Sequence, residues 1–142
     1  MNSDRHIIII FIVIASVLLS IAAIAGETAS AQSVYAAYVK TLKTATDLSD
    51  LDRFVSKQGI SERLSMSPQE QDETLEMAKA LHGQIKCTSA TGEIGDTEGT
   101  IILKGHDRYD ETSTIVLTVH MVNEPSGWKV EKESFSFSDT SP

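Results

Sequence analysis

The segment Thr-Ser-Thr-Ile-Val-Leu-Thr-Val-His-Met-Val at residues 112–122 decides the fold class of this chain. Successive side chains of an extended chain point to opposite faces. From residue 115 to residue 122 one face is wholly apolar and the other is half polar, so we expect a β-strand whose apolar face meets the core. The apolar face holds Ile115, Leu117, Val119 and Met121, and the other face holds Val116, Thr118, His120 and Val122.

A β-rich composition continues through the whole chain after Gly83, interrupted about every dozen residues by glycines and polar clusters. The pattern predicts four strands with short links, which favour an antiparallel meander. Trp128 and Val130 share one phase of the last strand, whereas Phe135 and Phe137 share the other. This change predicts a bulge or bend near residues 132–134 and a curved sheet. The expected strands are 84–90, 99–104, 112–122 and 127–137, and the links are 91–98, 105–111 and 123–126.

Three helices are expected before this sheet. Apolar residues recur at helical spacing over residues 32–46. A second, short helix should begin at residue 49 or 50 and end at Gly59, with residues 60–66 as a link. Ser67-Pro68-Gln69-Glu70 combines a cap, a first-turn proline and a capping-box glutamate, and predicts a third helix over 68–82 that ends at Gly83.

The fold class predicted from these patterns is α+β, with three helices packed on a curved, four-stranded antiparallel sheet. Residues 32–137 are expected to form a single domain, because the remaining length cannot support two cores. The tail at residues 138–142 is expected to be disordered.

An uncharged apolar segment, Ile7–Ala25, precedes this domain. As a helix it would extend about 28 Å, close to the thickness of a bilayer's hydrocarbon core. Arg5 lies before it and Glu27 after it, which predicts an N-terminus inside and a domain outside. Two interpretations of residues 1–31 stay open: a signal peptide cleaved after Ala31, or an uncleaved transmembrane anchor. The domain is therefore expected to be periplasmic, secreted or anchored on the outer side of a membrane.

The net charge limits the kinds of partner that the chain is expected to bind. The chain carries a formal net charge of −8, which makes nucleic acid and anionic membrane surfaces poor partners.

The sequence predicts neither a disulfide nor a bound group. Cys87 is the only cysteine, so no disulfide forms within the chain, and we expect a buried, inert thiol. No cofactor is expected. No metal site is expected either, because residues 92–99 fit no calcium loop and His82 with Cys87 lacks two further zinc ligands.

The turn Asn123-Glu124-Pro125-Ser126-Gly127-Trp128-Lys129-Val130, at the end of helices followed by a bent sheet, resembles the nuclear-transport-factor-two-like superfamily (NTF2-like), which includes ketosteroid isomerase. The resemblance implies a cone-shaped fold. Sheets of this superfamily commonly pair through their outer face, so the outer face of this sheet is expected either to be exposed to solvent or to form a homodimer. The superfamily contains isomerases, dehydratases and non-catalytic binding domains, and none of its catalytic positions aligns with a residue of this chain.

Two groups of residues are candidates for contact with a ligand or partner. Tyr35, Tyr38 and Trp128 could line a pocket in the cone, although amphipathic tyrosines on a packed helix are more often core residues. The cluster His106, Asp107, Arg108 and Tyr109 belongs to the expected hairpin loop 105–111. This loop is interpreted first as a solvated hairpin and second as a partner-contact loop.

The leading functional hypothesis is a non-catalytic, extracytoplasmic domain that binds an unknown protein partner or a small apolar ligand. The rival is an isomerase or dehydratase in which Tyr35, Tyr38 or His120 transfers a proton. A third class is an adaptor or immunity-type partner protein that would use the acidic surface and the loop 105–111.

Overall fold

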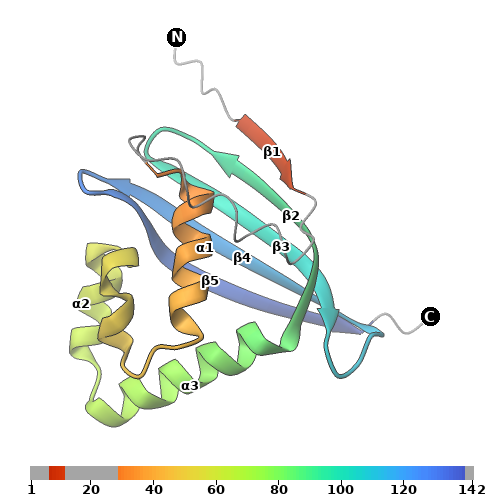
Figure 1. The fold of residues 1–142 in the computed structure, drawn as a ribbon, viewed down its shortest axis with the longest axis horizontal. Helices are drawn as coiled ribbons and strands as arrows, with labels where there is room; N and C mark the ends of the chain where they lie inside the picture. The colour runs from red at the N-terminus through yellow and green to blue at the C-terminus, as the bar shows by residue number, and fades with distance from the viewer. Residues whose placement is uncertain (1–6, 12–28, 140–142) are drawn as a thin grey trace.

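The computed structural model describes residues 7–11 and 29–139. The chain is an α+β protein in which helices precede a sheet, and the helices gather on one side of that sheet (Figure 1). The helical elements are α1 (Ala31–Leu42), the 3-10 helix η3 (Leu48–Phe54), α2 (Lys57–Ser65) and α3 (Pro68–Gln84). The strands that follow are β2 (Ile85–Ile94), β3 (Glu98–Asp107), β4 (Ser113–Glu124) and β5 (Gly127–Asp139).

Strands β2 to β5 pair antiparallel in chain order, which confirms the expected four-stranded meander. A further strand, β1 (Ile7–Phe11), pairs antiparallel with the free edge of β2. The first five residues of the segment expected to be an export helix are therefore extended, as suits a run of β-branched isoleucine. The remainder of that segment, residues 12–25, lies outside the described residues, and so does most of the leader.

Ala31, which the sequence placed last in the leader, is the first residue of α1 and is buried. Within the part of the chain that the structure describes, no helix combines the length and the apolar character needed to cross a membrane.

The helix predicted to end at Gly59 is in fact two helices, η3 and α2, so that prediction was wrong. The side chain of Ser56 caps α2 by accepting a hydrogen bond from the N–H of Gly59 at 3.1 Å. Gly59 thus lies in the first turn of a helix, and residues 60–65, expected as a link, are helical. The glycine resembled a stop signal, but the serine cap three residues before it decides the local structure.

The start of α3 agrees with the sequence. The Ser67 hydroxyl accepts from the Glu70 N–H at 3.2 Å, and the Glu70 carboxylate accepts from the Ser67 N–H at 2.6 Å, which completes the capping box. The helix runs through Gly83 to Gln84, two residues further than predicted. Strand β2 begins at the next residue, so the chain passes from helix to sheet without a loop.

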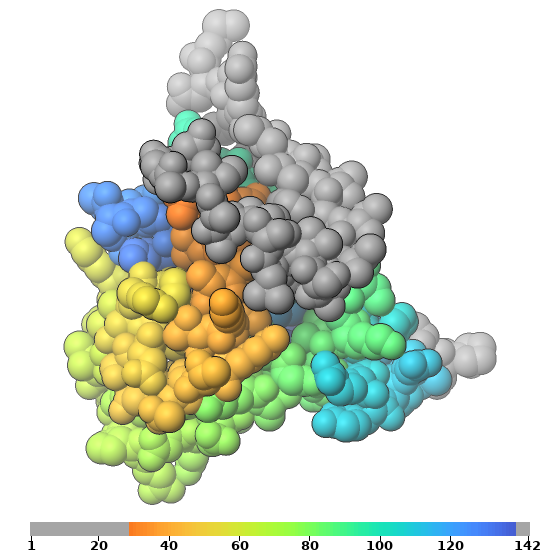
Figure 2. Space-filling model, viewed as in Figure 1, coloured from red at the N-terminus to blue at the C-terminus, as the bar shows by residue number. Residues whose placement is uncertain are grey.

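The core lies between β4 and the helices, which cover the sheet in Figure 2. All four residues of the apolar face predicted for β4 are 0% exposed, which confirms the predicted phase of this strand. Helix α1 packs Tyr35, Tyr38 and Leu42 against this face, and α3 contributes Leu75. The layer between helices and sheet is closed by the protein's own side chains.

A bulge was predicted near residues 132–134, and the structure has one in β5 at Glu131, one residue before that range. His120 pairs with Lys132, but the next residue of β4, Met121, pairs with Val130, so Glu131 is the extra residue. After this point the odd-numbered residues of β5 face the core, which explains why Phe135 packs against it. β5 continues to Asp139, so residues 138 and 139 are part of a strand and not of a disordered tail.

A second register shift, between Cys87 and Ser89 of β2, brings β2 close to Gly105 of β3. A Cβ atom at Gly105 would overlap the backbone of Lys86, so no larger residue fits this position without a shift. Both strands extend further than predicted, into residues 91–94 and 105–107.

Candidate functional site

A buried polar cluster joins α1, α3 and β5, and we call these four residues, Tyr35, Tyr38, His82 and Glu133, the Glu133 cluster. The Tyr35 hydroxyl donates to Glu133 Oε2 at 2.9 Å, and the Tyr38 hydroxyl donates to Oε1 at 2.6 Å. His82 Nε2 lies 2.7 Å from Glu133 Oε2. A single carboxylate is thus the common partner of three side chains from two helices.

Regular structure places each of these side chains. Tyr35 and Tyr38 lie three residues apart on α1, so they share its inward face, and their rings stack with centroids 5.7 Å apart. His82 comes from the end of α3, and its ring meets Phe135 edge-on at 5.4 Å. Glu133 faces the same way as Phe135 because the bulge at Glu131 changes the phase of β5.

The cluster is almost closed to solvent. Tyr35 and Tyr38 are 5% and 7% exposed, and the side chains of His82 and Glu133 are 6% and 13% exposed. Burial by itself raises the pKa of Glu133, but the hydrogen bond and charge of His82, with the hydrogen bonds of the two tyrosines, outweigh it and lower the pKa. The carboxylate is therefore held in its charged form.

The two tyrosines respond in the opposite direction. Burial raises the pKa of both hydroxyls well above 10.0, and the adjacent charge of Glu133 raises it further. Both hydroxyls stay protonated at neutral pH and serve as hydrogen-bond donors. The arrangement supplies donors to a fixed negative charge, and it leaves neither tyrosine suited to ionise.

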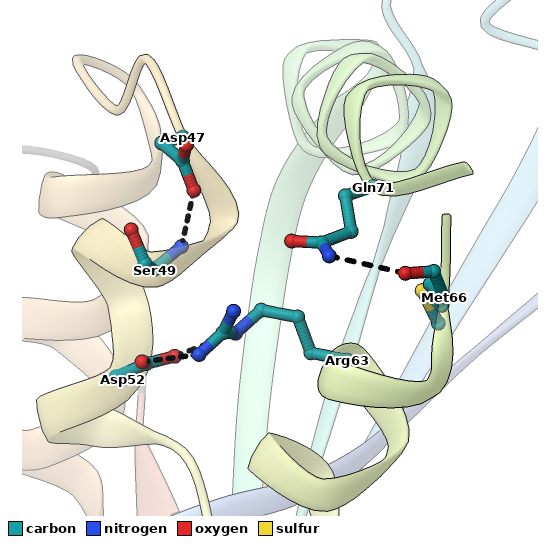
Figure 3. Close-up of polar contacts among 6 residues, drawn as sticks. All are labelled: Asp47, Ser49, Asp52, Arg63, Met66 and Gln71. Atoms are coloured by element: carbon teal, nitrogen blue, oxygen red, sulfur yellow. Dashed lines mark hydrogen bonds and ion pairs between the residues drawn. The ribbon is translucent and has the colours of Figure 1, made fainter. Parts of the chain in front are cut away.

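Beside the cluster an open groove of about 180 Å³ lies between η3, α2, α3 and β5. Tyr38 and Glu133 reach its lining, so the groove is where the cluster comes nearest to solvent. An ion pair between two lining residues connects α2 to η3. Arg63 of α2 donates two hydrogen bonds to Asp52 of η3, from Nε to Oδ1 at 3.0 Å and from Nη2 to Oδ2 at 2.6 Å (Figure 3). The apolar part of the lining consists of Leu48, Leu51, Val55, Met66 and Val130.

The structure separates the three residues predicted to line one pocket. Tyr38 lines the groove, whereas Tyr35 is buried within the cluster. Trp128, at the start of β5, is 9% exposed and borders a different hollow with Val34, Arg53 and Phe54. The two tyrosines meet at one site, and the tryptophan borders a separate hollow beside Val34 of α1.

The predicted loop cluster forms the β3–β4 hairpin tip, which protrudes at the lower right of Figure 2. His106 and Asp107 are the last residues of β3. Asp107 accepts from the Tyr109 N–H at 2.8 Å and from Gln84 Nε2 at 2.7 Å, so its carboxylate stabilises the turn. The side chain of Arg108 is exposed, and Tyr109 is 85% exposed. A contact role for this loop remains a prediction.

Two other residues from the sequence lie apart from the cluster. His120 is on the outer face of the sheet, where Nδ1 contacts Glu131 Oε2 at 2.7 Å and Nε2 lies 3.5 Å from Glu98. It cannot share a proton with Tyr35 or Tyr38 across the sheet. Cys87 is half-buried, and burial raises the pKa of its thiol, which makes it a weak nucleophile.

Sequence reasoning missed Glu133 and considered His82 only as a zinc ligand. A signal for Glu133 was present, because the phase change in β5 that places Phe135 inward places Glu133 inward too. An ionisable residue in phase with two phenylalanines on a core-facing strand needs a buried partner. His82 carried no such signal, since its contact with β5 depends on how α3 crosses the sheet.

Among residues 7–11 and 29–139, no three His, Cys, Asp or Glu side chains gather closely enough to hold a metal ion. Comparison of the chain with protein families, with curated proteins and with solved structures gave no match.

Proposed function

We propose that this chain is a non-catalytic binding domain, exported from the cytoplasm, that contacts a protein partner through the groove between η3, α2, α3 and β5. The observation that carries the proposal is the state of Glu133. Its two oxygens already receive three hydrogen bonds, and its lowered pKa makes it a poor general base, which works best with a pKa near the operating pH.

The packing of the interior supports binding at the surface. Leu117, Val119 and Met121 are fully buried beneath α1, so a small substrate finds no room between α1 and β4. The groove, by contrast, combines an apolar floor with charged groups at its border, among them Glu62 and Lys132. Apolar centres with polar rims are typical of protein contact sites.

The order of elements, helices followed by an antiparallel sheet, is compatible with the proposed NTF2-like cone, in which non-catalytic domains occur. The exported location rests on the composition of residues 1–31. Dimerisation through the outer sheet face remains a proposal from the same resemblance.

Affinity purification tests the proposed function. The full-length protein, produced in its own cells, should recover one protein at a stoichiometric ratio from the envelope fraction. The double variant Glu62→Lys/Lys132→Glu reverses two exposed charges of the groove border and should lose that protein at least tenfold. The matched control Glu76→Lys changes an exposed residue of α3 that does not line the groove, and should retain it.

A proton-transfer enzyme is the second candidate, because Tyr38 and Glu133 are hydrogen-bonded at 2.6 Å and both reach the groove. The variant Glu133→Gln separates the two functions. If the domain turns over a ketosteroid or a similar apolar carbonyl compound, and this variant abolishes the turnover under conditions in which circular dichroism shows that it is folded, the binding proposal is wrong. Binding without turnover in both proteins favours it.

A further inference from the structure

The edge of β5 that faces away from β4 is one margin of the sheet. β5 is a terminal strand of the sheet and is 13 residues long. Near its beginning, Val55 forms a parallel bridge with Val130, and the Ser56 N–H donates to the Val130 carbonyl at 2.9 Å. This edge therefore already accepts backbone hydrogen bonds from another part of the chain.

The pairing ends there because the chain turns into α2 at Lys57. Among the described residues, none outside β4 makes a backbone hydrogen bond to β5 beyond Val130. An edge strand with free N–H and C=O groups is a template for a further strand. Within the described part of the chain, residues 131–139 thus form a long open edge.

Only the first part of this edge carries the features by which proteins prevent edge pairing. Those features are bulges, exposed lysines and inward-pointing charges, and they occur here as the bulge at Glu131, the exposed Lys132 and the buried Glu133. The next five residues, 134–138, read Ser-Phe-Ser-Phe-Ser and contain no charge and no proline. Four of them are exposed.

This five-residue segment reads identically in both directions about Ser136. When two copies pair antiparallel about a two-fold axis at Ser136, that residue meets its own copy. Ser134 then lies opposite Ser138, and Phe135 opposite Phe137. Such a self-complementary contact is the isologous kind that closes as a dimer.

The two phenylalanines would bury apolar surface when the strands pair. Phe137 is 49% exposed although it lies on the core-facing side of β5, next to the partly buried Phe135. In the paired arrangement it would lie beside Phe135 of the partner subunit, and aromatic cross-strand pairs stabilise sheets. Residues 134–138 carry no charge, so no like charges face each other within these five residues.

We propose that two copies of this chain associate through residues 134–138 of β5, forming one continuous antiparallel sheet across a two-fold axis at Ser136. This dimer uses the edge of the sheet and leaves its outer face free. The contact spans about 17 Å of strand, at the lower end of specific interfaces, so association depends on concentration. The proposal stands independently of the function proposed for the groove.

Charged substitutions of Ser136 test the proposed dimer, because in this dimer Ser136 lies opposite Ser136 of the second copy. Sedimentation velocity of the full-length protein should show a dimer that grows with concentration. Ser136→Lys and Ser136→Glu should each raise the dimer dissociation constant at least tenfold, since like charges face each other. An equimolar mixture of the two variants should restore association. Dimers of either single variant at the wild-type level, or a mixture that stays monomeric, would contradict the proposal.

A control distinguishes the edge from the outer face. Thr118 lies on the outer face of β4, paired with Ser134, and is not on the edge. Thr118→Lys should leave the dissociation constant unchanged. Loss of the dimer in this variant but not in Ser136→Lys would assign the interface to the outer face, and a wild-type protein that is monomeric throughout would also overturn the proposal.

Disulfide trapping checks the register. In a Cys87→Ala background, Ser136→Cys should form a covalent dimer on mild oxidation, because paired residues of adjacent strands lie within reach of a disulfide. Ser134→Cys should not, since two copies of this position would be about 14 Å apart. Equal trapping of both variants would show that the register is wrong.

Discussion

Glu133 and His82 are 51 residues apart in sequence, yet Glu133 Oε2 and His82 Nε2 lie 2.7 Å apart in a largely buried contact between β5 and α3. This contact ties the last strand to the last helix. Because the same carboxylate also receives both α1 tyrosines, its loss affects three elements at once.

Replacement of Glu133 by glutamine should therefore destabilise the domain strongly. The variant keeps the shape of the side chain but removes the charge, and it leaves a buried histidine without its acidic partner. We expect the free energy of unfolding in urea at pH 7 to fall by about 3 kcal/mol. Glu62→Gln, at an exposed position, should change it by less than about 0.5 kcal/mol. A loss of similar size in both variants would show that the cluster contributes little.

The acid limb of the stability curve should depend on the same residue. The pKa of Glu133 lies below its value of 4.5 in an unfolded chain, so its contribution is present above pH 4.5 and is lost as the pH falls through the folded-state pKa. Thermal unfolding from pH 6 to pH 2.5 should show a smaller decline in Glu133→Gln than in the wild type. Identical slopes in the two proteins would contradict this assignment.

The alkaline limb should report the tyrosines. Their pKa values are raised above 10.0 in the fold, so their stabilisation is complete below pH 10 and declines as the pH rises beyond it. Tyr38→Phe should flatten the loss of stability between pH 9.5 and 11.5. Tyr109→Phe, at an exposed position, serves as the control and should leave that slope as in the wild type.

Two glycines offer a matched pair of substitutions. Gly105→Ala places a Cβ atom against the backbone of Lys86 and should cost about 2 kcal/mol, as overpacking does. Gly83→Ala meets nothing within 4 Å and lies in α3, so it should stabilise the protein by about 0.5–1 kcal/mol. Chemical unfolding of both variants measures the difference, and a stable Gly105→Ala protein would mean that β2 and β3 can separate at the bulge without penalty.

The ion pair between Asp52 and Arg63 should couple η3 to α2. Its side chains are 33% and 16% exposed and meet through two hydrogen bonds, so a double-mutant cycle of Asp52→Ala and Arg63→Ala should give a coupling of about 1 kcal/mol. The exposed pair Gln58 and Glu62, at 3.5 Å, should give a coupling near zero. Equal couplings would show that the bidentate geometry carries no energy.

Local patterns predicted the parts of the fold that depend on local chemistry. The capping box at Ser67 and the apolar face of β4 follow from spacing alone, and both are present in the structure. Gly59 misled the prediction because a glycine is compatible with a helix end and with the first turn after a serine cap. The position of Ser56, whose N–H donates a hydrogen bond to the Val130 carbonyl of a distant strand, decides between these two structures.

The candidate site was predictable only in part, because it is built from contacts between elements far apart in sequence. Tyr35 and Tyr38 were identified by their helical spacing. Their partner Glu133 lies 98 and 95 residues further along the chain, and its orientation depends on the bulge at Glu131. Periodicity can locate such a bulge to within a residue or two, but it does not say which helix will meet the side chain that the bulge turns inward.

The extra residue at Glu131 also makes the C-terminal half of β5 sensitive to chain length. Deleting that one residue would exchange inside and outside for every position after it, so serines would enter the core while phenylalanines entered water. We therefore expect this strand to tolerate substitution of single residues far better than deletion of one residue.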